Sequence, residues 1–316
     1  MQGETDGSGF KELGMIYCGS VAADPEMTDP DASVYLHRGY CYVLSQKVTY
    51  EEKRFSKHRN VSQEEVFRLK RFRLDNLNIS EELFYETMNE AWETVWTRMI
   101  FDRDDAYLEI FFEKDADEGH MMEVAGAMRL YRFRDGGDRE ELFSGDLPVS
   151  LNDTRAVDGK VEILGRYYAD DRIVLLSLDE EKKSFREQVI YETFAETDDY
   201  WLNRASFGDG YVMTYKRGIG AVGWEDPEND ENCIFRFYSE SGSPLGEKIL
   251  NYGKTMEDLH LEYDQYNSFW INYFLRDRDM FYGSLTVEGF NGKYWNIIRI
   301  PVDDSEDWSL LFSDSE

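Results

Sequence analysis

The chain repeats a short pattern of alternating apolar and polar residues that is interrupted by a tight turn. Each copy has an alternating segment, a turn containing Asp, Gly or Asn, and a second segment rich in aromatic and β-branched residues. Alternation with period two, broken by residues that tolerate positive φ, is typical of a β-hairpin. The sequence predicts five such hairpins, whose second strands begin at Tyr40, Ala106, Arg172, Tyr211 and Phe269.

Four of the hairpins continue into a third segment that alternates aromatic or aliphatic side chains with arginine or other polar residues. This pattern is expected of a strand with one face in water. The third segments cover residues 67–74, 128–134, 234–238 and 294–300. More polar fourth segments are found at residues 81–84, 140–143, 186–190 and 246–250. The pattern therefore predicts a repeated unit of four antiparallel strands.

Repeated four-stranded units with no helical pattern between them are typical of β-propellers. Over about residues 10–302 the chain resembles the irregular β-propeller repeat proteins of the TolB-like and NHL-like group, although it lacks the WD40 and kelch signatures. The resemblance implies an all-β propeller, with five blades expected and six allowed. We expect residues 10–17 to complete the last blade as an N-terminal strand, which would remove open sheet edges. A two-sheet sandwich is the alternative fold, and residues 81–99 have the spacing of one short helix.

The expected organisation is a single propeller domain at residues 1–302 and an acidic-hydrophobic tail at residues 303–316. The chain has 35 Lys and Arg against 65 Asp and Glu, a net charge of −30. This charge argues against nucleic-acid binding, which needs cationic surfaces. No apolar run approaches the roughly 18 residues of a membrane span, so membrane insertion is not expected.

Three widely spaced cysteines indicate buried thiols in a reducing compartment, which favours a cytoplasmic location. A secreted chain trimmed to its mature form is the alternative. The four histidines lack metal-ligand spacing, and the acidic loops lack the register of a calcium loop, so neither a metal nor a cofactor is expected.

Two segments are candidates for binding a protein partner. The first is a basic island at residues 53–73, which can dock an acidic partner or a second copy of the chain. Its members are Lys53, Arg54, Lys57, Arg59, Arg68, Lys70, Arg71 and Arg73. The alternative is that the arginines of this segment face water or pair with neighbouring glutamates.

The second candidate is the C-terminal tail, where Trp308, Leu311 and Phe312 lie between acidic residues. Hydrophobic anchors flanked by charge are typical of a short peptide motif that enters a groove on a partner. The segment around Trp308 is similar to the LIR motif of autophagy receptors. The alternative is that residues 308–312 pack on the domain as a terminal strand.

No catalytic motif is recognisable in the sequence, so we expect a non-catalytic binding or scaffold propeller rather than an enzyme. The alternative is a carbohydrate-active hydrolase with paired carboxylates in the central funnel. Its candidate acids lie in the predicted turns at Asp104, Asp105, Asp170, Asp171 and Asp209, where Asp is also common for conformational reasons.

Overall fold

The structure of the chain is a computed structural model. It describes residues 31–50, 62–88, 94–113, 126–134, 138–167, 172–191, 200–207, 210–217, 231–251, 268–277, 280–289, 292–301 and 309–314. All regular elements in these ranges are β-strands. Among the described residues, no helix is long and apolar enough to span a membrane.

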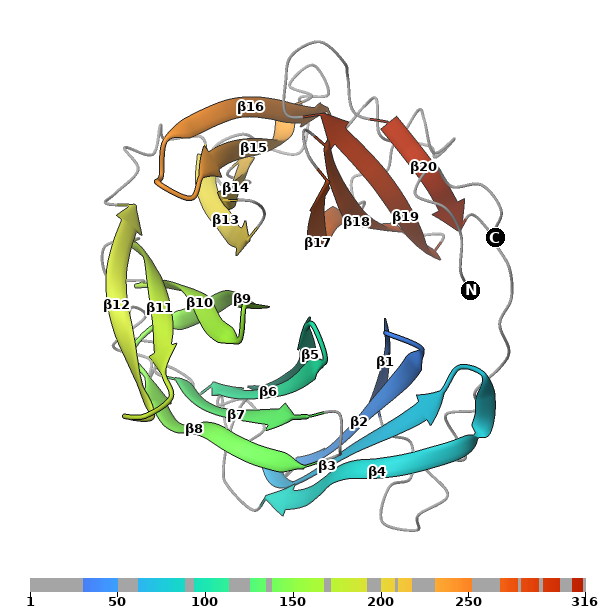
Figure 1. Cartoon of the computed structure of the whole chain (residues 1–316). Helices are drawn as coiled ribbons and strands as arrows, with labels where there is room; N and C mark the ends of the chain where they lie inside the picture. The colour runs from blue at the N-terminus through green and yellow to red at the C-terminus, as the bar shows by residue number, and fades with distance from the viewer. Residues whose placement is uncertain are drawn as a thin grey trace, which may run out of the picture. The chain divides into compact units, whose positions relative to one another are not determined.

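Each strand pairs with its neighbours in the sequence, so the described residues form five four-stranded antiparallel meanders (Figure 1). The first sheet contains β1 (Asp31–His37), β2 (Tyr40–Tyr50), β3 (Ser62–Arg73) and β4 (Asn76–Met88). The second contains β5 (Thr94–Asp102), β6 (Asp105–Glu113), β7 (Gly126–Phe133) and β8 (Arg139–Leu147). The third contains β9 (Ser150–Val157), β10 (Lys160–Arg166), β11 (Ile173–Asp179) and β12 (Ser184–Tyr191).

The fourth sheet contains β13 (Tyr200–Phe207), β14 (Gly210–Arg217), β15 (Glu231–Ser239) and β16 (Pro244–Asn251). The fifth contains β17 (Ser268–Asp277), β18 (Met280–Gly289), β19 (Gly292–Pro301) and β20 (Ser309–Asp314). A repeated four-stranded meander is the blade topology of β-propellers. The predicted all-β propeller class is therefore confirmed, while the number of blades and the closure of a ring stay predictions.

The chain divides into two compact units. The first comprises Met1–Gln2, Lys11–Asp170 and Leu175–Gln188, and the second comprises Gly3–Phe10, Asp171–Val174 and Val189–Glu316. The first unit thus holds the first two sheets and most of the third, and the second unit holds the fourth and fifth. The expected single domain at residues 1–302 stays a prediction.

The core of the first unit lies between its first and second sheets. Alternate residues of β2, β3 and β4 point towards alternate residues of β5, β6 and β7, because side chains alternate between the two faces of a strand. Phe67 and Phe112 meet edge to face with ring centroids 6.4 Å apart, and Phe84 packs on Tyr131 at 4.9 Å. Such aromatic pairs add about 0.5–1.5 kcal/mol beyond the area that they bury.

The strands predicted for the third sheet were shifted by one position. We expected residues 161–168 to be its first strand and residues 172–178 its second. The structure places β9 before them, so these segments belong to the second strand, β10, and the third strand, β11. The turn between β9 and β10 contains Asp158 and Gly159, with φ values of 53° and 76°. These left-handed conformations are those of a type I′ hairpin turn. β9 went unrecognised because its sequence, SLNDTRAV, is largely polar.

The hairpin predicted for the fifth sheet was shifted in the same way. Residues 269–274, expected as its second strand, belong to the first strand β17, and residues 259–263 lie outside the described part of the chain. The outer neighbour of β19 is β20, where Phe312 pairs with Ile297. The C-terminal segment therefore occupies the position at which we expected residues 10–17, which the structure does not describe.

The helix expected within residues 81–99 is not found. Residues 81–88 belong to β4 and residues 94–99 to β5. β4 pairs with β3 along its length, with Glu81 opposite Arg71 and Phe84 opposite Leu69. The cross-strand charge pair and the burial of Phe84 favour the strand over a weakly amphipathic helix.

Candidate functional site

Two acidic side chains and one arginine meet where the second sheet borders the third, within the first unit. Arg98 on β5 lies opposite Glu109 on β6 in the strand register. Its Nη1 donates a hydrogen bond of 2.7 Å to Oδ1 of Asp153 on β9. Its Nη2 lies 3.3 Å from Oε1 and 3.5 Å from Oε2 of Glu109. We call these three residues the acid-pair cluster.

The acid-pair cluster is largely shielded from water. The Glu109 side chain is 3% exposed, and those of Arg98 and Asp153 are 17% and 19% exposed. Burial by itself lowers the pKa of Arg98, but the two carboxylates outweigh it and raise this pKa above its ordinary value. The guanidinium is therefore a fixed positive charge. Asp153 is also held by the Thr154 backbone N–H, which donates to the same Oδ1 at 2.9 Å.

The geometry limits how far apart the two carboxylates can be. The contacted oxygens of Asp153 and Glu109 are bound to the two terminal nitrogens of one planar guanidinium, so they lie within about 8 Å of each other. Paired carboxylates of glycosidases are about 5–5.5 Å apart in retaining enzymes and about 6.5–9.5 Å apart in inverting ones. The upper limit of about 8 Å is compatible with either arrangement.

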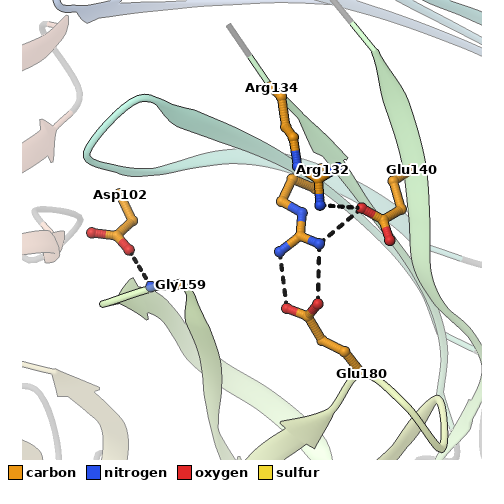
Figure 2. Close-up of polar contacts among 6 residues, drawn as sticks. All are labelled: Asp102, Arg132, Arg134, Glu140, Gly159 and Glu180. Atoms are coloured by element: carbon orange, nitrogen blue, oxygen red, sulfur yellow. Dashed lines mark hydrogen bonds and ion pairs between the residues drawn. The ribbon is translucent and has the colours of Figure 1, made fainter.

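A second set of polar contacts joins the same two sheets (Figure 2). Arg132 on β7 donates to Glu140 on β8 at 2.8 Å and makes two bonds of 3.0 Å to Glu180, which follows β11. Asp102 accepts a hydrogen bond of 2.6 Å from the Gly159 N–H. The bonds from Arg132 to Glu180 and from Gly159 to Asp102 link the second and third sheets, which are the sheets that carry Arg98 and Asp153.

The described arginines of the predicted basic island are engaged with acids of their own sheet. Arg68 donates to Glu82 at 2.7 Å and Arg71 to Glu81 at 2.6 Å, across the β3–β4 pairing. Arg73 donates to Asp75 at 2.9 Å. Lys70 lies opposite Glu82 in the register. Each pairing matches the alternative that we gave for this segment.

The other four members of the basic island, Lys53, Arg54, Lys57 and Arg59, lie outside the described residues. Leu311 and Phe312 of the predicted tail motif are part of strand β20, and Trp308 is outside the described ranges. This also matches the alternative of a terminal strand. A role of either segment in binding a partner stays a prediction.

The turn acids that we listed for the enzyme alternative are not brought together as a catalytic pair in the described residues. Asp104 forms an exposed ion pair with Arg38 of the neighbouring sheet. A similar exposed pair joins Arg103 to Asp158. These contacts link successive hairpin turns of the first unit, so their role there is structural. Asp170, Asp171 and Asp209 lie outside the described part of the chain.

Sequence reasoning missed all three members of the acid-pair cluster. One signal was available: Glu109 is the only charged residue within the apolar run from Ala106 to Phe112. A charge at the centre of a buried strand needs a partner, because burying an isolated carboxylate is costly. The partnership with Asp153 could not be found, because β9 itself was not recognised. Within the described residues, no group of three or more His, Cys, Asp or Glu could hold a metal ion.

No protein-family model and no curated protein matches the chain. Solved structures do resemble it. A glycosyl hydrolase from Bacteroides ovatus has 11% identity and a TM-score of 0.41, with 89% of this chain and 86% of that chain covered. A GH43_1 enzyme from Xanthomonas citri has 10% identity and a TM-score of 0.39, with 89% of both chains covered. A prolyl oligopeptidase B from Galerina marginata has 14% identity and a TM-score of 0.42, with 86% and 32% covered.

These similar structures are enzymes, which overturns our expectation of a non-catalytic scaffold. With TM-scores near 0.4 and identities of 14% or less, the likeness transfers no substrate and no residue role. The substrate class and the residue roles are therefore argued below from the side chains of this protein alone.

Proposed function

We propose that the protein is a glycoside hydrolase that uses Asp153 and Glu109 as its pair of carboxyl groups. The observation that carries the proposal is their placement on either side of Arg98, within about 8 Å of each other. Hydrolysis of a glycosidic bond needs one group to protonate the leaving oxygen and a second to activate water or to attack the anomeric carbon.

Asp153 is the base or nucleophile in this proposal. It is the more exposed of the two carboxylates, and its Oδ1 is fixed by two hydrogen bonds. Glu109 is the proton donor. Its side chain is 3% exposed and lies against the Arg98 guanidinium.

Arg98 is the positioning residue that joins the two groups. Its contacts to Glu109, at 3.3 and 3.5 Å, are longer than its 2.7 Å bond to Asp153. The longer contacts are the weaker ones, so Glu109 is the carboxylate that is more easily released when a substrate hydroxyl competes for the guanidinium. Glu109 then carries a proton to the leaving oxygen as the C–O bond breaks, and water, after losing its proton to Asp153, supplies the hydroxyl of the product.

The proposal is tested by single substitutions in the full chain, Asp153→Asn and Glu109→Gln, with a panel of 4-methylumbelliferyl glycosides as substrates. Glu162→Gln is the matched control. Glu162 lies opposite Arg155 on β9 and accepts a bond of 2.8 Å from it, so it repeats the Arg98–Glu109 pairing in the third sheet. Thermal melts verify that each variant is folded.

We expect the wild-type protein to hydrolyse at least one glycoside of the panel. Asp153→Asn and Glu109→Gln should each lower kcat by about 10²-fold or more, since each removes one proton-transfer or nucleophilic group. Glu162→Gln should retain kcat within about threefold. Failure of the wild-type protein on every glycoside, or full activity of Asp153→Asn, would overturn the proposal.

A further inference from the structure

Trp96 on β5 exposes a large aromatic surface. It is 42% exposed, and it is the one aromatic residue among the exposed large hydrophobic side chains whose burial the structure describes. Single exposed apolar side chains are common in folded proteins, so it is the position of Trp96 relative to the acid-pair cluster that makes it a candidate contact for a ligand.

The strand register places Trp96 on the same face of the second sheet as the acid-pair cluster. Trp96 and Arg98 are alternate residues of β5, with partners Phe111 and Glu109 on β6. Alternate residues of a strand share a face and lie about 7 Å apart along it. Trp96 is therefore the neighbour of Arg98 on this face of β5, and its partner Phe111 is the neighbour of Glu109 on β6.

The indole of Trp96 packs against the ring of a buried residue, Phe111. The rings of Trp96 and Phe111 have centroids 5.4 Å apart and are inclined by 57°. Phe111 is itself fixed, because it fills the space that a side chain at Gly126 would need: a Cβ there would lie 2.2 Å from the Phe111 Cζ. A rigid, exposed aromatic face costs little entropy when a ligand covers it.

We propose that Trp96 is the stacking platform for a pyranose ring of the substrate, next to the carboxylates. The inference rests on the proposed function, which it extends to a substrate class: oligosaccharides of pyranoses with equatorial hydroxyls, whose ring faces carry only C–H groups. The polarised C–H groups lie on the negative face of the indole. The hydroxyls at the ring edge then reach the Asp153 carboxylate and the Arg98 guanidinium, the two partly exposed groups of the acid-pair cluster.

The test measures binding separately from hydrolysis. Asp153→Asn is the parent variant, and cellohexaose and xylohexaose, whose ring hydroxyls are all equatorial, are titrated into it by isothermal calorimetry. Trp96→Ala and Trp96→Phe are added to this parent, and Ile79→Ala is the control for the loss of an exposed apolar side chain. Ile79 is 50% exposed and lies on β4 of the first sheet.

We expect at least one hexaose to bind the parent, and Trp96→Ala to raise its Kd by about tenfold or more. Trp96→Phe should change the Kd by less than about threefold, because a ring face remains, and Ile79→Ala should leave it unchanged. An unchanged Kd in Trp96→Ala, or no binding of any hexaose by the folded parent, would overturn the inference.

Failure of the inference and failure of the proposed function give different results. If hexaose binding depends on Trp96 while the wild-type protein hydrolyses no glycoside, the platform stands and the hydrolase proposal falls. If Asp153→Asn abolishes hydrolysis while Trp96→Ala leaves both Kd and KM unchanged, the hydrolase proposal stands and the platform falls.

Discussion

Replacing Arg132 with methionine tests how the second and third sheets are held together. The guanidinium makes two bonds of 3.0 Å to Glu180 and one of 2.8 Å to Glu140, and its side chain is 9% exposed (Figure 2). Burial by itself lowers the pKa of Arg132, but the two glutamates raise it above its ordinary value. Methionine fills a similar volume and removes only the charge and the donors.

The expected cost follows from the exposure of the three groups. A hydrogen bond to a charged group contributes about 1.5–3 kcal/mol, and breaking a fully buried pair costs about 3–5 kcal/mol. Glu140 and Glu180 are 45% and 36% exposed, so water can solvate both once the arginine is gone. We therefore expect Arg132→Met to lower the free energy of unfolding by about 2 kcal/mol at pH 7.

Arg134→Met is the matched control, because Arg134 donates to the same Glu140 oxygen at 2.9 Å but is 56% exposed. Exposed pairs contribute little, so this variant should lose no more than about 0.5 kcal/mol. Urea denaturation of the full chain, followed by circular dichroism and tryptophan fluorescence, measures both. An equal loss in the two variants would refute the distinction between the shielded and the exposed contact.

The pH dependence has a definite sign. The hydrogen bond from Arg132 lowers the pKa of Glu140 below its ordinary value of 4.5. A carboxyl whose pKa is lower in the folded state contributes stability that is complete above the unfolded pKa and is lost as pH falls through the folded pKa. The difference between wild type and Arg132→Met should hold from pH 7 to about pH 5 and narrow below pH 4. A difference that widens on acidification would contradict this reasoning.

Two further predictions concern packing and the C-terminal strand. Gly126→Ala should lower the unfolding free energy by about 1–3 kcal/mol, because its Cβ would meet the Phe111 ring at 2.2 Å, and Phe111→Leu in the same chain should reduce the extra cost in a double-mutant cycle. Deletion of residues 309–316 removes the partner of β19 and should lower the Tm of the full chain, whereas a free tail could be removed without any change in the melt.

The repeated strands could be predicted from the sequence wherever the hairpin turn and the apolar alternation agreed. β5, β6 and β7 were all found within a residue or two, since the run from Ala106 to Phe112 follows a turn and is followed by the alternating run from Met128. β9 was missed because the first strand of a meander can be polar when only part of it is buried, as the sequence SLNDTRAV shows. β17 was misplaced because Arg278 and Asp279, between β17 and β18, lack the usual Gly or Asn of a hairpin turn.

The candidate site depends on a pairing between strands 55 residues apart, which no local pattern encodes. The sequence contains many Arg and Glu residues at alternating positions, and most such pairs need no function. Arg155 and Glu162 show the ordinary case: they lie opposite each other on β9 and β10 and neutralise one another. Arg98 and Glu109 occupy the corresponding positions on β5 and β6.

The difference between these two arginine–glutamate pairs is the basis for assigning chemistry to one of them. Both are cross-strand pairs between the first and second strands of a sheet, and Arg98 also binds a carboxylate from the next sheet, Asp153. One arginine between two acids leaves the three groups with a net negative charge, and a proton or a substrate group can therefore be accommodated there without leaving a buried positive charge unpaired. Arg155 and Glu162, by contrast, carry one positive and one negative charge and balance each other. The Glu162→Gln control therefore separates the loss of any arginine-paired carboxylate from the loss of Glu109. Equal effects of Glu162→Gln and Glu109→Gln on kcat would remove the physical reason for placing catalysis at Arg98.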